Sequence, residues 1–230
     1  MMSFDIAAVL DYLIKLLPAI RITLVIVVSS ILLGLIVGTL VALPQLYNIP
    51  VLKRLSQLYL SFFRGTPILI QLFLFYYGLP ELLKLVAIDA ARVPALYYVI
   101  LTYALHSGAF MAEMIRAAVA AVDRGQVEAA YAVGMSGLQA FWRIVLPQAI
   151  ATALPVFANL TIANLKDTSL AFTLGVMELT GKSQTLGVMS RQFLETYAAL
   201  AILYFILSFV LERLFHLLER RMSRKGMAGI

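Results

Sequence analysis

The sequence contains no cysteine and only two histidines, His106 and His216. The first absence excludes disulfides, thiolate metal sites and cysteine nucleophiles, and the second argues against a metal site built from several histidines. Charge is also scarce, because only 13% of the 230 residues are charged, compared with roughly 25% in a soluble domain. Hydrophobic residues make up 62% of the chain. This composition excludes an ordinary soluble globule.

The uncharged stretches of the chain indicate membrane spans, since about 20 apolar residues cross a bilayer core of about 30 Å as a helix. Five stretches qualify: from Ile22 to about Leu43, from about Leu58 to Leu79, from Val93 to Ala112, from Ile144 to Leu165, and from Tyr197 to Leu211. We expect Pro44, Asn48 and Pro50 to end the first span with turn chemistry. The second contains Arg64-Gly65-Thr66-Pro67, which predicts an irregular backbone there. The predicted fold class is an all-α integral membrane protein with about five transmembrane helices.

The positive charges predict the orientation, because Lys and Arg collect in cytoplasmic loops. An odd number of spans puts the termini on opposite faces. One face receives ten cations, Lys53, Arg54, Arg116, Arg124, Arg143, Arg213, Arg220, Arg221, Arg224 and Lys225, and the other receives six, Lys15, Arg21, Lys84, Arg92, Lys182 and Arg191. We therefore expect the N-terminus outside and the C-terminus inside. We attribute the net charge of +6 to the Lys and Arg residues of the cytoplasmic side, so no nucleic-acid partner is expected.

The N-terminal segment 1–17 has no cationic region before its apolar residues, so a cleavable signal peptide is not predicted. Apolar residues recur at helical spacing, with Asp11 and Lys15 on the opposite side. This pattern is typical of a helix at the membrane interface. No internal repeat interrupts the remainder, so residues 1–230 are predicted to form a single membrane domain.

The longest polar stretch, about 113–148, contains the most specific pattern in the chain. It reads Glu128-Ala129-Ala130, three residues, Gly134, nine residues, Ile144, one residue and Leu146-Pro147. Helix formers around Glu128, a break at Gly134 and Gly137 and a second amphipathic stretch predict two short helices at an angle. Such a helix could fit a groove on a partner protein, with the alanines permitting close approach and Glu128 offering a charge. The alternative is a surface helix without a partner.

Together with other blocks, this pattern resembles the polar amino acid permease family of ABC importers. The blocks are Phe63-Arg64-Gly65-Thr66-Pro67, Tyr76-Tyr77-Gly78-Leu79-Pro80, Gly125-Gln126, Pro147-Gln148-Ala149 and Lys166-Asp167-Thr168-Ser169-Leu170. The resemblance covers residues 17–220 and implies a type I ABC importer permease fold in a bacterial cell (inner) membrane. It also implies a second permease subunit, identical or closely homologous, two cytoplasmic ATPase subunits and an extracytoplasmic substrate-binding protein. ATP-driven closure of the ATPases would then push the Glu128 loops and rock the spans.

The segment from Gly175 to Ser183 resembles a phosphate-binding loop, but five residues separate its glycines where the motif needs four. Nucleotide binding by this chain is therefore rejected. We expect a non-catalytic transport subunit that binds no cofactor or metal itself, with ATP and Mg on the partner ATPase.

Charged side chains at membrane depth need a reason to be there, because each costs roughly 2.5 to 3.5 kcal/mol at a helix centre. The predicted substrate pathway contains four of them, Arg64, Glu113, Lys166 and Asp167, and five neutral polar residues, Thr66, Asn159, Asn164, Thr168 and Ser169. A zwitterionic amino acid needs such groups for its carboxylate and its ammonium. Asn159 and Lys166 share a helix face, and Arg64 is expected to pair with Asp167 in the empty site. The alternative is that these charges pair structurally or reach the interface.

Other polar or small residues in the spans have plainer interpretations. His106 is expected to be a hydrogen-bonded packing residue, and Gly34 and Gly38 are expected to permit close helix contact. The rival functions are a standalone secondary transporter or channel, and a membrane enzyme. The small number of spans and the Glu128 pattern argue against the first, and the lack of clustered catalytic groups argues against the second. Leu160 follows the asparagine of the fourth span, where related permeases for cationic amino acids carry acidic or amide residues, which favours a less polar or sulfur-containing amino acid such as cystine.

Overall fold

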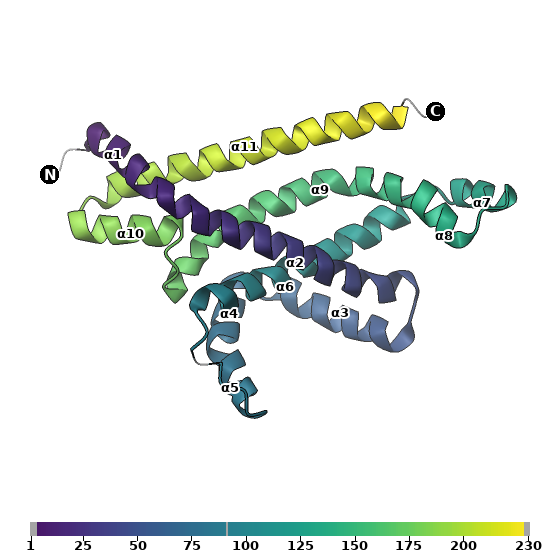
Figure 1. The fold of residues 1–230 in the computed structure, drawn as a ribbon, viewed down its shortest axis with the longest axis horizontal. Helices are drawn as coiled ribbons and strands as arrows, with labels where there is room; N and C mark the ends of the chain where they lie inside the picture. Colours follow the sequence, from purple (N-terminus) through teal and green to yellow (C-terminus); the bar gives the residue numbers. More distant parts are fainter. Residues whose placement is uncertain (1–3, 91, 228–230) are drawn as a thin grey trace.

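The computed structural model describes residues 4–90 and 92–227, and every regular element in this part of the chain is a helix (Figure 1). In chain order the α-helices are α1 (Ile6–Leu16), α2 (Ile20–Leu46), α3 (Pro50–Gly65), α4 (Ile68–Phe73), α5 (Leu79–Lys84), α6 (Ala95–Ala120), α7 (Arg124–Ala132), α8 (Gly137–Ala140), α9 (Leu146–Asp167), α10 (Leu179–Ser190) and α11 (Phe193–Met227). Two 3₁₀ segments, η1 (Leu17–Ala19) and η4 (Thr168–Leu174), and two π-helical segments, η2 (Leu74–Gly78) and η3 (Phe141–Val145), connect them. The all-helical fold class is confirmed.

Four helical stretches are long and apolar enough to cross a membrane, namely 6–46, 95–120, 137–174 and 193–222. A fifth crossing is possible where the pair α3 and α4–α5 is counted as one bent span. The predicted number of spans is therefore confirmed, although their limits differ. Pro44 itself does not end the first span, because α2 continues past it to Leu46; the helix loses one hydrogen bond there and still completes its last turn. The predicted turn follows at Asn48, whose φ of 54° is left-handed, and Pro50 starts α3. The N-terminal helix α1 runs through η1 directly into α2.

The second span is broken, as the sequence predicts. It begins at Pro50 and bends by 110° between Gly65 and Ile68. Thr66 and Pro67 adopt extended backbone conformations at the bend, because the residue before a proline disfavours helical angles. The α4–α5 arm consequently projects from the side of the bundle (Figure 1).

The centre of the bundle is the contact between α2 and α6. A Cβ atom added at Gly38 would lie 2.8 Å from Met111 Cβ and 3.0 Å from the Gly108 carbonyl oxygen, and one at Gly34 would lie 3.1 Å from the Ala104 oxygen. These positions accept no side chain larger than hydrogen without movement. The close contact expected of Gly34 and Gly38 is confirmed.

One end of the bundle is fixed by a polar network around α10. Glu178 is fully buried and accepts hydrogen bonds from the backbone N–H groups of Thr180 and Gly181, each at 2.8 Å, and from the Tyr204 hydroxyl at 3.0 Å. Thr23 of α2 accepts the Leu179 N–H at 3.2 Å. The network joins α10 to α2 and α11 at this end of the bundle.

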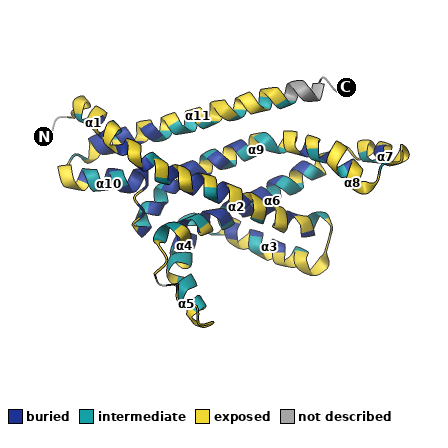
Figure 2. Ribbon diagram, viewed as in Figure 1, coloured by how far each residue is buried: buried dark blue, intermediate teal, exposed yellow. Residues whose placement is uncertain are grey.

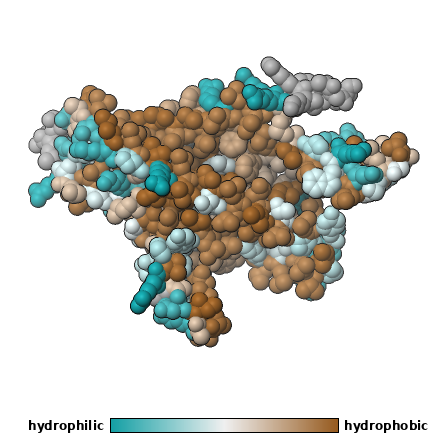
Figure 3. Space-filling view, in the orientation of Figure 1, coloured by the Kyte–Doolittle hydropathy of each residue, from teal (hydrophilic) through white to brown (hydrophobic). Residues whose placement is uncertain are grey.

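The remaining surface of the spans is apolar. Exposed residues follow the outer faces of α2, α9 and α11 (Figure 2), and hydrophobic side chains dominate the visible face of the molecule (Figure 3). Such a surface requires lipid or a protein partner. The two chain ends lie at opposite ends of the long axis (Figure 1).

Candidate functional site

Two short helices, α7 and α8, form a loop at the end of the bundle opposite α10 (Figure 1). Asp123 starts α7 by accepting the Gly125 N–H at 2.8 Å. The helix ends before Gly134, whose φ of 83° lies in the left-handed region that glycine adopts freely. Ser136 then starts α8 with a capping box that pairs it with Gln139. The predicted helix around Glu128 and the break at Gly134 are confirmed, but the second helix begins at Gly137, inside the predicted break, and continues through η3 into α9 rather than forming a separate short helix. We call residues 123–140 the coupling loop.

The Glu128 pattern presents a mixed surface on this loop. Glu128 and Ala129 are exposed, whereas Ala130 is buried under the loop. Ile144 and Leu146 are half-buried, and Pro147 lies exposed in the first turn of α9. These last three residues lie directly after the coupling loop, where η3 continues without a break into α9.

The side chain of Gln148 connects the coupling loop to α9. The amide of Gln148 on α9 donates to the Gln126 side-chain oxygen on α7 at 2.6 Å and to the Ile144 carbonyl at 2.9 Å. Two of the sequence blocks noted above, Gly125-Gln126 and Pro147-Gln148-Ala149, thus meet in space. This bond and the buried Ala130 link α7 to the start of α9.

The central helix α6 has three packed faces and one open face, because successive residues lie about 100° apart around a helix. Ala104 and Gly108 face α2, Ser107 and Met111 face α9, and the Leu105 carbonyl accepts the Tyr59 hydroxyl of α3. The fourth face carries His106, Phe110, Glu113 and Ala117, none of which is buried. It lies opposite α2 and between α3 and α9.

A cavity of about 1160 Å³ adjoins this open face at the coupling-loop end, and we call it the polar cavity. Its lining comes from the end of α2, from α3 and from α6: Gln45, Leu46, Asn48, Lys53, Gln57, Leu60, Ser61, Arg64, Gly65, Phe110, Glu113, Arg116 and Ala120. Glu113 lies 3.6 Å from Arg64 and accepts two N–H groups of Arg116, including Nε at 2.9 Å. The predicted residues Arg64 and Glu113 are therefore brought together.

One exposed stripe of α9 is polar or small, although Ile150 and Val156 beside it are exposed and apolar. Thr152, Pro155, Asn159, Ala163 and Lys166 are exposed and recur at spacings of three and four residues, so they form one stripe. Among the predicted pathway residues, Asn159 and Lys166 thus share a face, as their spacing indicates.

The other predicted pathway residues lie elsewhere. Asn164 is buried between helices, where it donates to Ser107 at 2.8 Å and accepts the Ser30 hydroxyl at 3.1 Å. The Thr168 hydroxyl is buried and donates to the Leu165 carbonyl, and Ser169 is half-buried. In this structure Asn164 and Thr168 hold helices together.

Arg64 and Asp167 do not form the expected pair. The Asp167 carbonyl accepts the Tyr103 hydroxyl at 2.5 Å, which places Asp167 at the level of Tyr103 on α6. Arg64 instead pairs with Glu113, ten residues further along α6, a distance of about 15 Å. That part of the prediction was wrong, because α3 breaks before it reaches the level of Asp167.

A network that the sequence did not indicate surrounds the break in the second span. Gln71 is fully buried, and its amide lies 2.9 Å from the Phe63 carbonyl, 3.0 Å from the Thr66 carbonyl and 2.8 Å from the Thr66 hydroxyl. Nδ1 of His106 lies 3.0 Å from the Gln71 oxygen, so the packing role expected of His106 is confirmed. The sequence feature that could have indicated this network is the polar Gln71 within the otherwise apolar run of residues 68–75.

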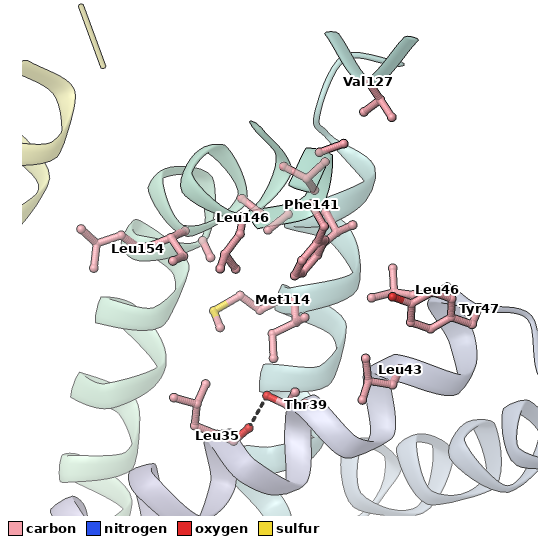
Figure 4. A pocket seen from close by; sticks show the side chains of 18 of the residues that line it. Leu35, Thr39, Leu43, Leu46, Tyr47, Met114, Val127, Phe141, Leu146 and Leu154 are labelled. Atoms are coloured by element: carbon pink, nitrogen blue, oxygen red, sulfur yellow. Dashed lines mark hydrogen bonds between the residues drawn. The ribbon is translucent and has the colours of Figure 1, made fainter. Parts of the chain in front are cut away.

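A second cavity, of about 850 Å³, lies on the other side of α6 between α2, α9 and the coupling loop (Figure 4). Its walls are almost entirely apolar, and the hydroxyl of Thr39 is already bonded to the Leu35 carbonyl at 2.8 Å (Figure 4). This apolar cavity suits a hydrocarbon chain and has no charged residue in its lining to bind a zwitterion. Among the described residues no group of three His, Asp or Glu is arranged to hold a metal ion.

Comparison with known proteins gives a consistent set of similarities. The family described as "Binding-protein-dependent transport system inner membrane component" matches residues 30–224. The L-cystine transport system permease protein TcyL of Bacillus subtilis is 46% identical over 222 residues, which cover 96% of this chain and 93% of that protein. The glutamine transport system permease protein GlnP of Escherichia coli is 32% identical over 96% of this chain and 99% of its own length.

Among solved structures, an amino acid ABC transporter crystallised with histidines superposes with a TM-score of 0.84 at 30% identity, over 96% of this chain and 100% of that one. The MetNI methionine ABC transporter in an inward-facing conformation gives a TM-score of 0.64 at 19% identity, over 90% of this chain and 96% of that one. At that identity the second similarity concerns the fold alone.

Proposed function

Because the chain belongs to the family of binding-protein-dependent transport system inner membrane components, we propose that it is one permease subunit of a bacterial ABC importer for polar amino acids. It is a multi-pass inner membrane protein of this transport family. Its substrate, its partners and the direction of transport are the parts that we propose. A standalone secondary transporter or channel is not favoured, since the similar proteins are permeases of multi-component transport systems.

The observation that carries the proposal is the coupling loop. It presents Glu128 and Ala129 to solvent and is fastened to α9 by the bond between Gln126 and Gln148. Small side chains permit a close approach, and an exposed carboxylate offers an ion pair to a basic groove. A cytoplasmic ATPase on each permease subunit would push on this loop, and ATP and Mg would be bound there rather than by this chain.

The partner within the membrane is proposed to be a second copy or a close homologue. The stripe on α9 exposes Asn159 and Lys166, and the open face of α6 exposes Glu113. Polar groups of this kind face a bundle interior or a water-filled cavity. Pairing two subunits across these faces would enclose a pathway, which an extracytoplasmic binding protein would load at the α10 end.

The proposed substrate is an amino acid, with cystine the first to test. The L-cystine permease of Bacillus subtilis is a similar protein, and Leu160 follows Asn159 on α9 without adding charge. The pathway would contain Asn159, Lys166 and Asp167 toward the α10 end and Arg64, Thr66 and Glu113 toward the coupling loop. Asn164, Thr168 and Ser169 would position these residues.

Co-purification and uptake test the function together. A tagged chain, expressed with its ATPase and binding-protein partners, should retain a stoichiometric ATPase and support ATP-dependent uptake of labelled L-cystine or another polar amino acid into proteoliposomes. Uptake by the chain alone, driven by an ion gradient and without ATP, would instead make it a secondary transporter.

Cysteine labelling tests the proposed orientation, since the chain has no native cysteine. Met189 of α10 is 79% exposed and Leu138 of α8 is 70% exposed, so cysteines at these positions should react with a membrane-impermeant reagent from opposite sides. Ser183 is unsuitable, because it is fully buried against the Thr196 carbonyl. Labelling of Met189→Cys from the cytoplasmic side would contradict the proposed orientation.

A further inference from the structure

The polar cavity contains three cations, and their hydrogen bonds differ. Lys53 donates to Asn48 at 2.8 Å, and Arg116 donates two N–H groups to Glu113. Arg64 makes only a 3.6 Å ionic contact with Glu113 and donates no hydrogen bond to any residue that the structure describes. Its guanidinium therefore keeps its five N–H donors available.

The surroundings of Arg64 hold this guanidinium at the cavity wall. Its carbon atom lies 5.9 Å from the centre of the Phe110 ring, which supports a cation on its face. Glu113 is already occupied by Arg116, so it restrains Arg64 by charge without using its donors. On α3, Gln57, Ser61 and Arg64 lie three and four residues apart and all line the cavity. The result is a planar cationic fork facing a space large enough for an amino acid.

From this geometry we infer that Arg64 binds the carboxylate of the transported amino acid in the polar cavity, and that Glu113 restrains the guanidinium until the substrate arrives. This inference rests on the proposed function and adds to it the group that recognises the substrate. A guanidinium matches a carboxylate with two parallel hydrogen bonds, which an ammonium does not.

The two residues should give effects of opposite sign. Arg64→Gln removes the fork and should weaken binding of an amino acid about 10- to 100-fold, the range expected for hydrogen bonds to a charged group. Arg64→Lys keeps the charge but not the fork and should fall between. Glu113→Gln releases Arg64 and should tighten carboxylate binding, which general damage to the fold would not do.

Binding is measured on the purified permease–ATPase complex in phosphatidylcholine nanodiscs without the binding protein. Matched probes differ only in their carboxylates: L-histidine and histamine or L-arginine and agmatine differ by one, and L-cystine and cystamine differ by two. The wild-type complex should prefer the amino acid of the pair that it binds, and Arg64→Gln should lose that preference while binding of the amine is unchanged. Arg54→Gln is the matched control, because it removes one positive charge from an exposed position of the same helix outside the cavity.

Each result separates this inference from the proposed function. Wild-type affinity in Arg64→Gln overturns the inference and leaves transport intact. An effect of Arg64→Gln that appears only when anionic lipid is added assigns the guanidinium to a lipid phosphate and also overturns it. If the wild-type complex neither binds nor transports any of these amino acids, the proposed function fails and the inference fails with it.

Discussion

The side-chain oxygen of Gln71 lies 3.0 Å from Nδ1 of His106, and this contact joins the break in the second span to the middle of α6. The amide nitrogen of the same residue reaches the carbonyls of Phe63 and Thr66, which the helix cannot satisfy once Pro67 interrupts it. A single buried side chain thus supplies the hydrogen bonds that the bent backbone lacks.

Replacing Gln71 with leucine should lower the stability of the purified protein by about 1 to 3 kcal/mol, because it leaves buried backbone carbonyls unpaired. Thermal unfolding in detergent measures the change. Gln57→Leu is the control, since Gln57 is an exposed glutamine of the same span. Equal melting temperatures for the two variants would show that the break does not depend on Gln71.

Gly38→Ala should destabilise the contact between α2 and α6 by about 1 to 3 kcal/mol, as expected for overpacking. The added methyl group would meet Met111 Cβ at 2.8 Å and backbone atoms of Gly108 and Ala112 at 3.0 Å. At Gly78 the nearest atom would be 3.7 Å away, so Gly78→Ala provides the matched comparison. Unfolding curves that coincide for the two variants would count against the close packing described above.

Glu178 predicts a pH dependence of stability at the α10 end. Burial raises the pKa of this carboxyl above its ordinary value of 4.5, outweighing the hydrogen bonds from Thr180, Gly181 and Tyr204 that favour the charged form. The folded protein therefore holds this proton more tightly than the unfolded chain, and the stabilisation is fully present below pH 4.5 and is lost as the pH rises through the folded-state pKa.

The difference in stability between wild type and Glu178→Gln isolates this effect, because all other titrating groups are shared. The extra stability of the wild type over Glu178→Gln should decrease as the pH is raised from 4.5. Melting temperatures of both proteins across that range provide the measurement. A difference that grows with pH would mean that the buried carboxyl is stabilised in its charged form.

Changes in the coupling loop should abolish transport and leave membrane insertion intact. Glu128→Lys reverses an exposed charge, and Gly134→Val places a β-branched residue at a φ of 83°, a strain of about 1 to 3 kcal/mol. ATP-dependent uptake and substrate-stimulated ATPase activity are the measurements. Glu81→Lys, an exposed charge reversal on α5, should behave as wild type. Retention of both activities by Glu128→Lys would exclude a role for the loop in coupling.

The spans and the coupling loop could be predicted because their signals are local. Uncharged runs mark the crossings, and the spacing from Glu128 to Pro147 carries both the helices and the break between them. Pro44 misled the prediction of the first helix end, since a proline in the last turn removes only one hydrogen bond while the surrounding contacts keep the chain helical.

The partners of the charged residues could not be predicted, because they depend on how far each helix reaches. Arg64 and Asp167 have complementary charges, yet the bend after Gly65 leaves them at different depths. Asn164 and Asn159 look equivalent in the sequence, although one joins three helices and the other faces outward. Which asparagine points inward follows from the rotation of α9 against α6, a long-range property.

The shortness of α3 has a consequence for how the protein enters the membrane. With 16 residues, the helix is about 24 Å long, less than the bilayer core of about 30 Å, and it begins beside Lys53 and Arg54. The translocon should therefore release α3 poorly as a single helix, and we expect α3 to enter the lipid as a hairpin with α2. In vitro insertion of nascent chains that end after residue 70 should already show α2 and α3 inserted together, whereas insertion of α3 only in chains that end after residue 125 would mean that it waits for α6. The length of α3 thus predicts the order in which the helices enter the membrane.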